Sequence, residues 1–156
     1  DDTYIQKLSS KYDSNDYTST DSKPVVNESN QNDVINAKAL LTKSTSVDFI
    51  ANTAKFLDSG DATSKLDEFI EIAKVLDGSI IQIEGNIASD NDDEDGINLS
   101  KNRAETVKQY FVLNGISADR IVTVGNGGTK PVAPNDSETN MQKNRRTDIS
   151  FKIIEE

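Results

Sequence analysis

Apolar and polar side chains recur along this chain with two periods, and each period predicts a different kind of element. Between residues 61 and 78 the apolar positions are three and four residues apart, which is typical of a helix with one apolar face. That face is formed by Leu66, Phe69, Ile70, Ala73 and Leu76. The capping residues 61–64 and Gly78 are placed to begin and end this helix. The same spacing predicts a second helix over about residues 98–114, which Gly115 ends.

Alternation with a period of two predicts strands. Val47 and Phe49 alternate with polar neighbours, and the β-branched run 79–84 places Ile81 and Ile83 on one face. Residues 120–124 and 147–154 are also expected to be strands, on either side of an irregular stretch that contains Gly and Pro. The resulting βαβαββ order predicts an α+β sandwich with two right-handed crossovers, a closing edge strand, and helices that cover one face of a mixed sheet.

Residues 1–36 differ in composition from the rest of the chain. Ser, Asp, Asn and Thr dominate this stretch, and its few apolar side chains cannot bury enough surface to offset the loss of chain entropy. We expect at most a short helix over residues 3–11. We interpret residues 1–36 as a polar tether or the end of a preceding domain, and residues 37–156 as one domain. Because the chain begins with Asp1 rather than Met, we expect a processed form or an excised fragment.

The composition excludes several classes of function. The chain has no Cys and no His, which excludes disulfides, thiol or imidazole relays, and metal sites built from thiolate or imidazole ligands; any metal would have to be a hard cation held by oxygen. With 27 acidic and 17 basic side chains its net charge is −10, which argues against nucleic acid and against an anionic membrane surface as partners. No apolar run reaches 18 residues, so we expect no membrane insertion. No pair of carboxylates is singled out by spacing, and we expect neither catalysis nor a cofactor.

The acidic loop 90–96 raises the question of a calcium site. It places oxygen-bearing side chains and Gly96 at positions one, three, five and six of an EF-hand-like loop. The template then fails, because Asn98 and Asn102 replace the aliphatic residue and the bidentate Glu that it requires. We therefore expect a solvated acidic loop and no metal site, and a weak calcium-responsive loop is a third, lesser hypothesis.

Three segments carry a resemblance to a known family. They are Leu99-Ser100-Lys101-Asn102-Arg103-Ala104, then Gly115-Ile116-Ser117-Ala118-Asp119-Arg120-Ile121 with Val124-Gly125, and Asn144-Arg145-Arg146-Thr147-Asp148-Ile149. In this order and spacing they resemble the OmpA-like C-terminal domain, a peptidoglycan-binding module of bacterial envelope proteins. The resemblance covers about residues 40–153. It implies the same fold, no enzymatic activity, and a place in the bacterial cell envelope, periplasmic or extracellular and associated with the cell wall.

The resemblance also implies a ligand site for diaminopimelate of the peptidoglycan stem peptide. In the family an Arg after Leu-Ser takes the ligand carboxylate, and an Asp in a Gly-His-Thr-Asp turn takes its ammonium. Carried over to this chain, the Arg is Arg103, its neighbour is Leu99, a first-loop residue is Asn52, and the Asp position is Ala88. Arg145 completes the ligand-binding candidates.

A structural role is also expected at the Asn-Arg-Arg segment. One of Arg145 and Arg146 is expected to pair with an acid and fix the last loop, and the other to be solvated. For Arg103 itself, a helix start close by would add a dipole that favours an anionic ligand.

The turn after the second strand departs from the family pattern. Gly85 is kept, but Asn86, Ile87 and Ala88 replace His, Thr and Asp. Losing one partner of a partly buried charge pair costs about 2–5 kcal/mol, unless Asp90 or Asp92 takes its place. Two functions follow: non-covalent peptidoglycan binding that anchors a larger envelope protein to the wall, or a scaffold that has lost the wall site and serves as a protein-interaction or structural module. The sequence leaves the formation of a homodimer open.

Overall fold

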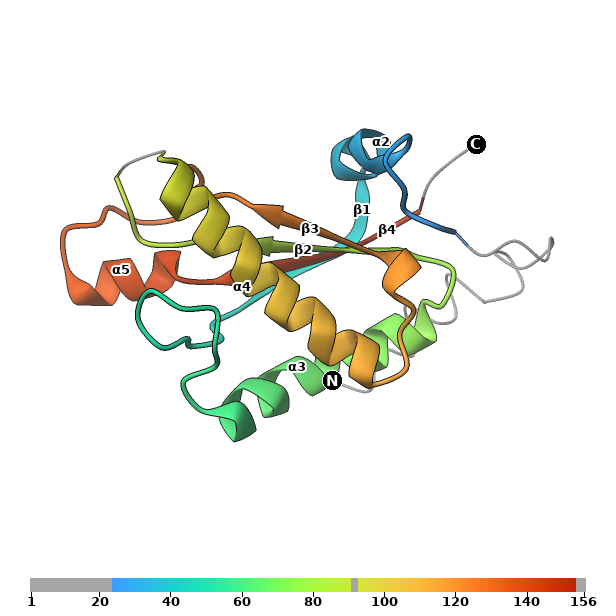
Figure 1. Ribbon diagram of the computed structural model, residues 1–156, viewed down its shortest axis with the longest axis horizontal. Coiled ribbons are helices and arrows are strands. Elements are labelled where there is room, and N and C mark those ends of the chain that lie inside the picture. Colours follow the sequence, from blue (N-terminus) through green and yellow to red (C-terminus); the bar gives the residue numbers. More distant parts are fainter. Residues whose placement is uncertain (1–23, 91–92, 154–156) are drawn as a thin grey trace.

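A four-stranded sheet flanked by helices organises the chain (Figure 1). The computed structural model describes residues 24–90 and 93–153. The short helix expected over residues 3–11 lies outside the described residues. The elements in chain order are α2 Gln31–Asn36, β1 Ala39–Thr45, α3 Ser59–Val75, β2 Ile80–Gly85, α4 Glu94–Leu113, the 3-10 turn Ala118–Arg120, β3 Ile121–Gly125, α5 Glu138–Asn144 and β4 Thr147–Lys152.

The strand order is β1-β4-β2-β3, and the sheet is mixed. Strands β2 and β3 run parallel, whereas β4 runs antiparallel to both of its neighbours, β1 and β2. The α+β class with a mixed sheet is therefore confirmed. The expected closing edge strand is wrong, because β4 lies inside the sheet and β1 and β3 form its edges. Interior strands are buried on both faces, and five of the six residues of β4 are buried.

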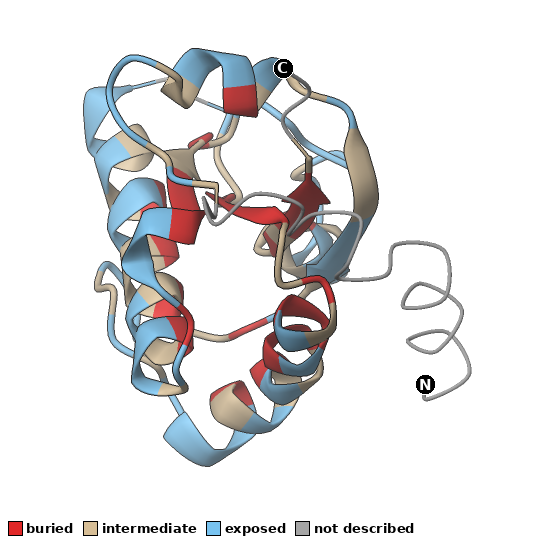
Figure 2. Cartoon of the chain, turned by 90° about the vertical axis from the view of Figure 1, so that its right-hand side faces the viewer, coloured by how far each residue is buried: buried red, intermediate tan, exposed pale blue. Residues whose placement is uncertain are grey.

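Helices α3 and α4 cover one face of this sheet and enclose the main core (Figures 1 and 2). The apolar stripes predicted for both helices are buried here against alternate residues of the strands. The largest fully buried side chains from three different elements are Phe69 of α3, Phe111 of α4 and Phe151 of β4. Burying an aromatic side chain of this size contributes about 1.5–3 kcal/mol, so these three rings hold the helices against the sheet.

The first strand and helix α5 differ from the sequence prediction. The first strand runs over Ala39–Thr45, and residues 47–56 form instead a hairpin-like loop closed by a bridge between Phe49 and Phe56. Because β1 is an edge strand, its exposed residues Thr42, Lys43 and Ser44 give no alternation to detect. Helix α5 was not predicted, since Pro131 and Pro134 indicated an irregular stretch throughout.

Helix α4 also starts earlier than expected, at Glu94, where the Asp93 side chain accepts a 2.8 Å hydrogen bond from the Gly96 amide. Part of the expected acidic loop is therefore the first turn of this helix. Arg103 lies nine residues further on, about 13 Å along the axis. The helix dipole acts within the first turn only, so the expectation that it assists Arg103 is wrong.

Helix α2 lies on the face of the sheet opposite α3 and α4, beside the start of β2. Val34 packs there against Ile80 and Val122 in a second, small apolar cluster. The Lys152 amine donates hydrogen bonds to the carbonyls of Val34 and Ile35, at 3.0 and 2.8 Å, and to Gln82 Oε1 at 2.8 Å. Gln82 is buried because this contact covers it. The domain boundary near residue 36 stays a prediction.

Replacing Lys152 by methionine is expected to lower the free energy of unfolding by about 1–3 kcal/mol, because three buried acceptors lose their donor. Burial lowers the pKa of Lys152, so the folded protein releases this proton more readily than the unfolded chain. Its contribution to stability therefore increases as pH rises from the lowered folded value towards about 10.4, the value of a free lysine.

Urea unfolding of both proteins at pH 7 and pH 10 measures this difference. The gap between wild type and Lys152→Met should be wider at pH 10, and a gap that narrows would contradict the assignment. The exposed Lys38 makes no hydrogen bond or ion pair with the described residues, so Lys38→Met is the matched control and should change little.

Candidate functional site

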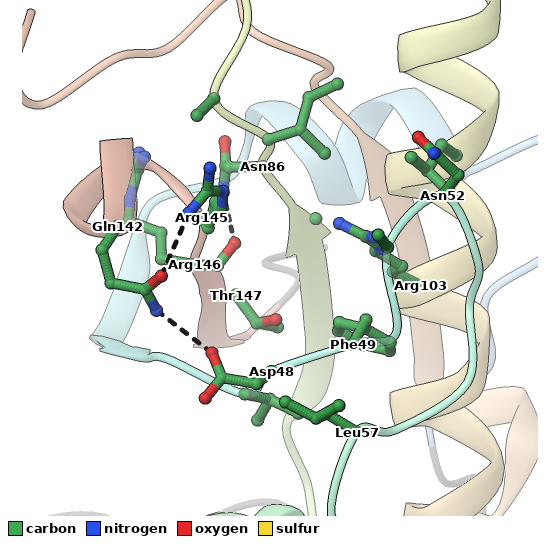
Figure 3. A pocket seen from close by; sticks show the side chains of 16 residues that line it. Asp48, Phe49, Asn52, Leu57, Asn86, Arg103, Gln142, Arg145, Arg146 and Thr147 are labelled. Atoms are coloured by element: carbon green, nitrogen blue, oxygen red, sulfur yellow. Dashed lines mark hydrogen bonds between the residues drawn. The ribbon is translucent and has the colours of Figure 1, made fainter. Parts of the chain in front are cut away.

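A pocket of about 550 Å³ opens where four segments meet: the loop after β1, the turn after β2, the first half of α4 and the corner between α5 and β4 (Figure 3). The structure brings all five ligand-binding candidates from the sequence to this one pocket. They are Asn52, Ala88, Leu99, Arg103 and Arg145. These five candidates come from four separate segments of the chain, so the sheet order and the placement of α4 create the site.

Arg103 projects from α4 into the pocket and is held from one side only. Its Nε donates a 2.8 Å hydrogen bond to the carbonyl of Thr53, and its guanidinium lies over the ring of Phe49, 4.9 Å from the centroid. Its two terminal amino groups donate to no residue that the structure describes. The side chain is thus fixed in place while its planar fork stays available for a carboxylate.

The loop after β1 supplies these contacts. Asn52 adopts a positive φ of 60°, a conformation that Asn tolerates better than most residues. The turn around it is closed by hydrogen bonds from the Thr53 amide and hydroxyl to the carbonyl of Ile50, at 3.0 and 2.8 Å. Thr106 of α4 donates to the carbonyl of Ala54 at 2.7 Å. The loop is therefore fastened to α4 at two points, one of which is Arg103.

The turn after β2 forms the pocket wall that faces α4. Gly85 is required there, because a Cβ at this position would lie 2.1 Å from the backbone carbonyl oxygen of Ser100. Asn86 is buried, and its Nδ2 donates to the carbonyl of Arg146 and to Asp148 Oδ2, both at 3.2 Å. It ties the turn to β4. Ala88, at the expected ammonium site, presents only a methyl group to the pocket.

The corner between α5 and β4 carries two arginines that both pair with acids. Arg145 pairs with Glu138, whose side chain is exposed. Arg146 pairs with Asp148 at 3.2 Å, and both of these side chains are less than 15% exposed, at 12% and 14%. One of the two arginines was expected to pair with an acid and the other to be solvated. The second half of this expectation is wrong, because both arginines pair with an acid.

Positive charge dominates the pocket although the chain as a whole is acidic. The charged side chains that line it are Asp48, Arg103, Arg145 and Arg146. Burial lowers the pKa of Arg103, and the charge of Arg145 lowers it further. An arginine stays protonated under such shifts, so the two guanidinium groups repel each other. An anionic ligand group between them would relieve this repulsion.

Sequence reasoning missed several residues that shape this site. Asp48 accepts a 3.1 Å hydrogen bond from Gln142, and Phe49 stacks under Arg103. Phe49 had been interpreted as a strand residue, and Gln142 lies in the unpredicted helix α5. A local pattern could have indicated only Ser137, which caps α5 by accepting a hydrogen bond from the amide of Asn140.

The acidic loop does not contribute to the described pocket. Asp90 accepts a 2.9 Å hydrogen bond from Asn135, and Asp93 caps α4. Asn91 is the first position of the calcium hypothesis, and Asp92 is one of the two residues suggested to replace the lost Asp. Both lie outside the described residues. Among residues 24–90 and 93–153, no group of three or more acidic side chains is placed to hold a metal ion.

Comparison with known proteins gives a consistent result. The sequence model of the OmpA family matches residues 49–145. Outer membrane protein A of Bordetella avium is 32% identical over 115 residues, which is 74% of this chain and 57% of that protein. The peptidoglycan-binding protein ArfA of Mycobacterium bovis is 43% identical over 63 residues, 39% of this chain and 19% of that protein.

A solved structure agrees with these sequence matches. The crystal structure of the peptidoglycan-associated lipoprotein from Burkholderia pseudomallei superimposes with a TM-score of 0.60 at 26% identity, and the match covers 70% of this chain and 90% of that one. The curated relatives are longer: the chain spans 57% of the length of the first and 19% of the second.

Proposed function

This chain belongs to the OmpA family, and from that membership we propose that its pocket binds peptidoglycan and anchors a larger envelope protein to the cell wall without a covalent bond. The ligand is the diaminopimelate side chain of the stem peptide. One observation carries the proposal: Arg103 is fixed by Thr53 and Phe49 while its terminal amino groups stay without a partner among the described residues.

Arg103 takes the ligand carboxylate in this proposal. A guanidinium fork binds a carboxylate through two parallel hydrogen bonds, and partial burial of Arg103 strengthens them relative to bulk water. Leu99 packs beside the ligand chain, and Asn52 and Arg145 close the rim. The names of two relatives support this choice, because one is a peptidoglycan-binding protein and another a peptidoglycan-associated lipoprotein. Members of this family that bind peptidoglycan are not enzymes.

A bacterial cell envelope location follows from the same proposal, on the periplasmic or extracellular side where the wall lies. Outer membrane protein A and the lipoprotein of the comparison are envelope proteins by name. Across the described residues, no helix combines the length and the apolar character that crossing a membrane requires.

Ala88 favours a second candidate, a scaffold that has lost the wall ligand and serves as a protein-interaction or structural module. Without an acid at this position the usual partner for the ligand ammonium is missing. The two candidates differ in one measurement: sedimentation of the natural domain with purified diaminopimelate-type peptidoglycan. Binding supports wall anchoring, and absence of binding overturns it in favour of the scaffold.

Replacing Ala88 by aspartate is expected to raise the affinity for diaminopimelate at least about tenfold, because a new carboxylate faces the ligand ammonium across the pocket. Isothermal titration with diaminopimelate measures the effect. Ala88→Asn is the matched control: it has the same shape without the charge and should not raise the affinity. If only the Ala88→Asp protein binds, the natural domain has given up this ligand; if aspartate and asparagine act alike, the geometry assigned to position 88 is wrong.

A further inference from the structure

Asp48 is the one carboxylate among the described residues that line the pocket. It lies at the start of the loop after β1, on a different wall from Ala88, and its backbone carbonyl accepts a 2.9 Å hydrogen bond from the Leu57 amide. Only one of its side-chain oxygens, Oδ1, accepts a hydrogen bond from a described residue, namely from Gln142. The second oxygen, Oδ2, has no donor in the part of the chain that the structure describes.

Gln142 keeps this carboxylate apart from the nearest arginine. Its Nε2 donates to Asp48 at 3.1 Å, while its Oε1 accepts a 3.3 Å hydrogen bond from Arg145 Nη1 (Figure 3). A neutral amide thus stands between a negative and a positive group, and Arg145 pairs instead with Glu138. The charge of Asp48 is therefore not neutralised by an ion pair within the described chain.

The other acids near the pocket are committed to structural contacts. Asp148 accepts from Arg146, from Asn86 and from the Ser44 hydroxyl. Asp90 does not line the pocket, and it accepts a hydrogen bond from Asn135. Among the described acids, only Asp48 combines a position on the pocket wall with an oxygen that accepts no hydrogen bond and a charge without an ion pair.

We propose that Asp48 takes the ammonium of the ligand, so that the pocket binds a zwitterion between Asp48 and Arg103 in place of an Asp at position 88. This inference rests on the proposed function, since it assigns a second contact in the same site. Asp48 comes from the loop after β1, and Arg103 comes from α4. Asp48 has one oxygen, and Arg103 two terminal amino groups, without a hydrogen-bond partner among the described residues. A ligand that carries an ammonium and a carboxylate matches this pair, whereas a purely anionic ligand would be repelled by Asp48.

The test compares two ligands that share a carbon chain and two carboxylates: diaminopimelate, with ammonium groups, and pimelate, without them. Replacing Asp48 by asparagine keeps the shape of the side chain and a hydrogen bond to Gln142 but removes the charge. The Asp48→Asn protein is expected to bind diaminopimelate at least about tenfold more weakly than wild type in isothermal titration. Its affinity for pimelate should stay equal or increase, because the repulsive charge is gone.

The results separate the assignment of Asp48 from the proposed function of the pocket. If Asp48→Asn weakens both ligands equally, or leaves diaminopimelate unchanged, the assignment of Asp48 is overturned while wall binding stands. If the wild-type domain binds neither diaminopimelate nor peptidoglycan, the proposed function fails and this assignment fails with it. The double variant Asp48→Asn with Ala88→Asp should regain diaminopimelate affinity, since it moves the carboxylate to the other wall.

A matched control separates this effect from a change in net charge. Glu71 is exposed on α3 and makes no hydrogen bond or ion pair with the described residues. Glu71→Gln removes one negative charge at a residue that does not line the pocket. It should leave the affinity for both ligands unchanged; an effect equal to that of Asp48→Asn would mean that overall charge, not position, is responsible, and would overturn the assignment.

Discussion

Replacing Arg103 by alanine is expected to weaken the binding of diaminopimelate at least about thirtyfold, which corresponds to about 2 kcal/mol or more. Among the described residues that line the pocket, Arg103 is the one cation whose side chain is fixed by the loop after β1 and whose terminal amino groups donate to no described residue. Its removal leaves the ligand carboxylate partly buried in the pocket without this partner. Isothermal titration of both proteins with diaminopimelate, and sedimentation with peptidoglycan, measure the loss.

Two further variants show whether this loss reflects recognition. Arg103→Lys keeps the charge but not the planar fork or the stacking on Phe49, so its affinity should fall between wild type and Arg103→Ala. Lys108 lies on the same helix and makes no hydrogen bond or ion pair with the described residues, so Lys108→Ala should bind as wild type does. If Arg103→Ala binds peptidoglycan as strongly as wild type, the pocket is not the wall site.

Arg103→Ala also removes the hydrogen bond to Thr53 and the contact with Phe49, so stability must be measured alongside affinity. We expect the free energy of unfolding to fall by about 2–4 kcal/mol, the sum of one hydrogen bond to a charged group and one partly exposed cation–π contact. The protein stays folded at that cost. A loss of affinity with retained circular dichroism therefore reports on the ligand contact.

Local patterns were sufficient to predict those helices and strands in which buried apolar residues recur at one regular spacing. The stripe Leu66, Phe69 and Ala73 is buried in the core that α3 shares with α4 and the sheet, and Ile81 and Ile83 are buried in the same core. The position of β4 could not be predicted in this way. An edge strand and an interior strand with polar ends have similar sequences, and only pairing with both β1 and β2 distinguishes them.

The candidate site was predictable as far as the motif segments extend. The motif placed Arg103 and Leu99 on one helix face, and the structure adds Ala88, Asn52 and Arg145 around them. The contact between Asp48 and Gln142 joins residues 94 positions apart, and no local pattern encodes it. Long-range contacts of this kind decide which charge in the pocket is free, so the ammonium partner becomes visible only in three dimensions.

Replacing Gly85 by alanine is expected to lower the free energy of unfolding by about 3 kcal/mol, the upper end of the range for overpacking. The added Cβ would lie 2.1 Å from the carbonyl oxygen and 2.9 Å from the carbonyl carbon of Ser100, both backbone atoms of α4. Backbone cannot rotate away as a flexible side chain does, so the whole helix must move. Arg103 follows Ser100 by one turn, and its position in the pocket would shift with the helix.

Gly60→Ala is the matched control for this substitution. Its added Cβ would meet only Asp58 Oδ1 at 3.4 Å, an ordinary contact, in the first turn of α3. Alanine at such a position reduces the freedom of the unfolded chain and is expected to stabilise the protein by about 0.4–1 kcal/mol. Urea unfolding of the three proteins therefore gives opposite signs for the two glycines. If Gly85→Ala unfolds like wild type, α4 can move away from β2 at little cost, and the pocket wall that positions Arg103 is softer than its contacts with Ser100 indicate.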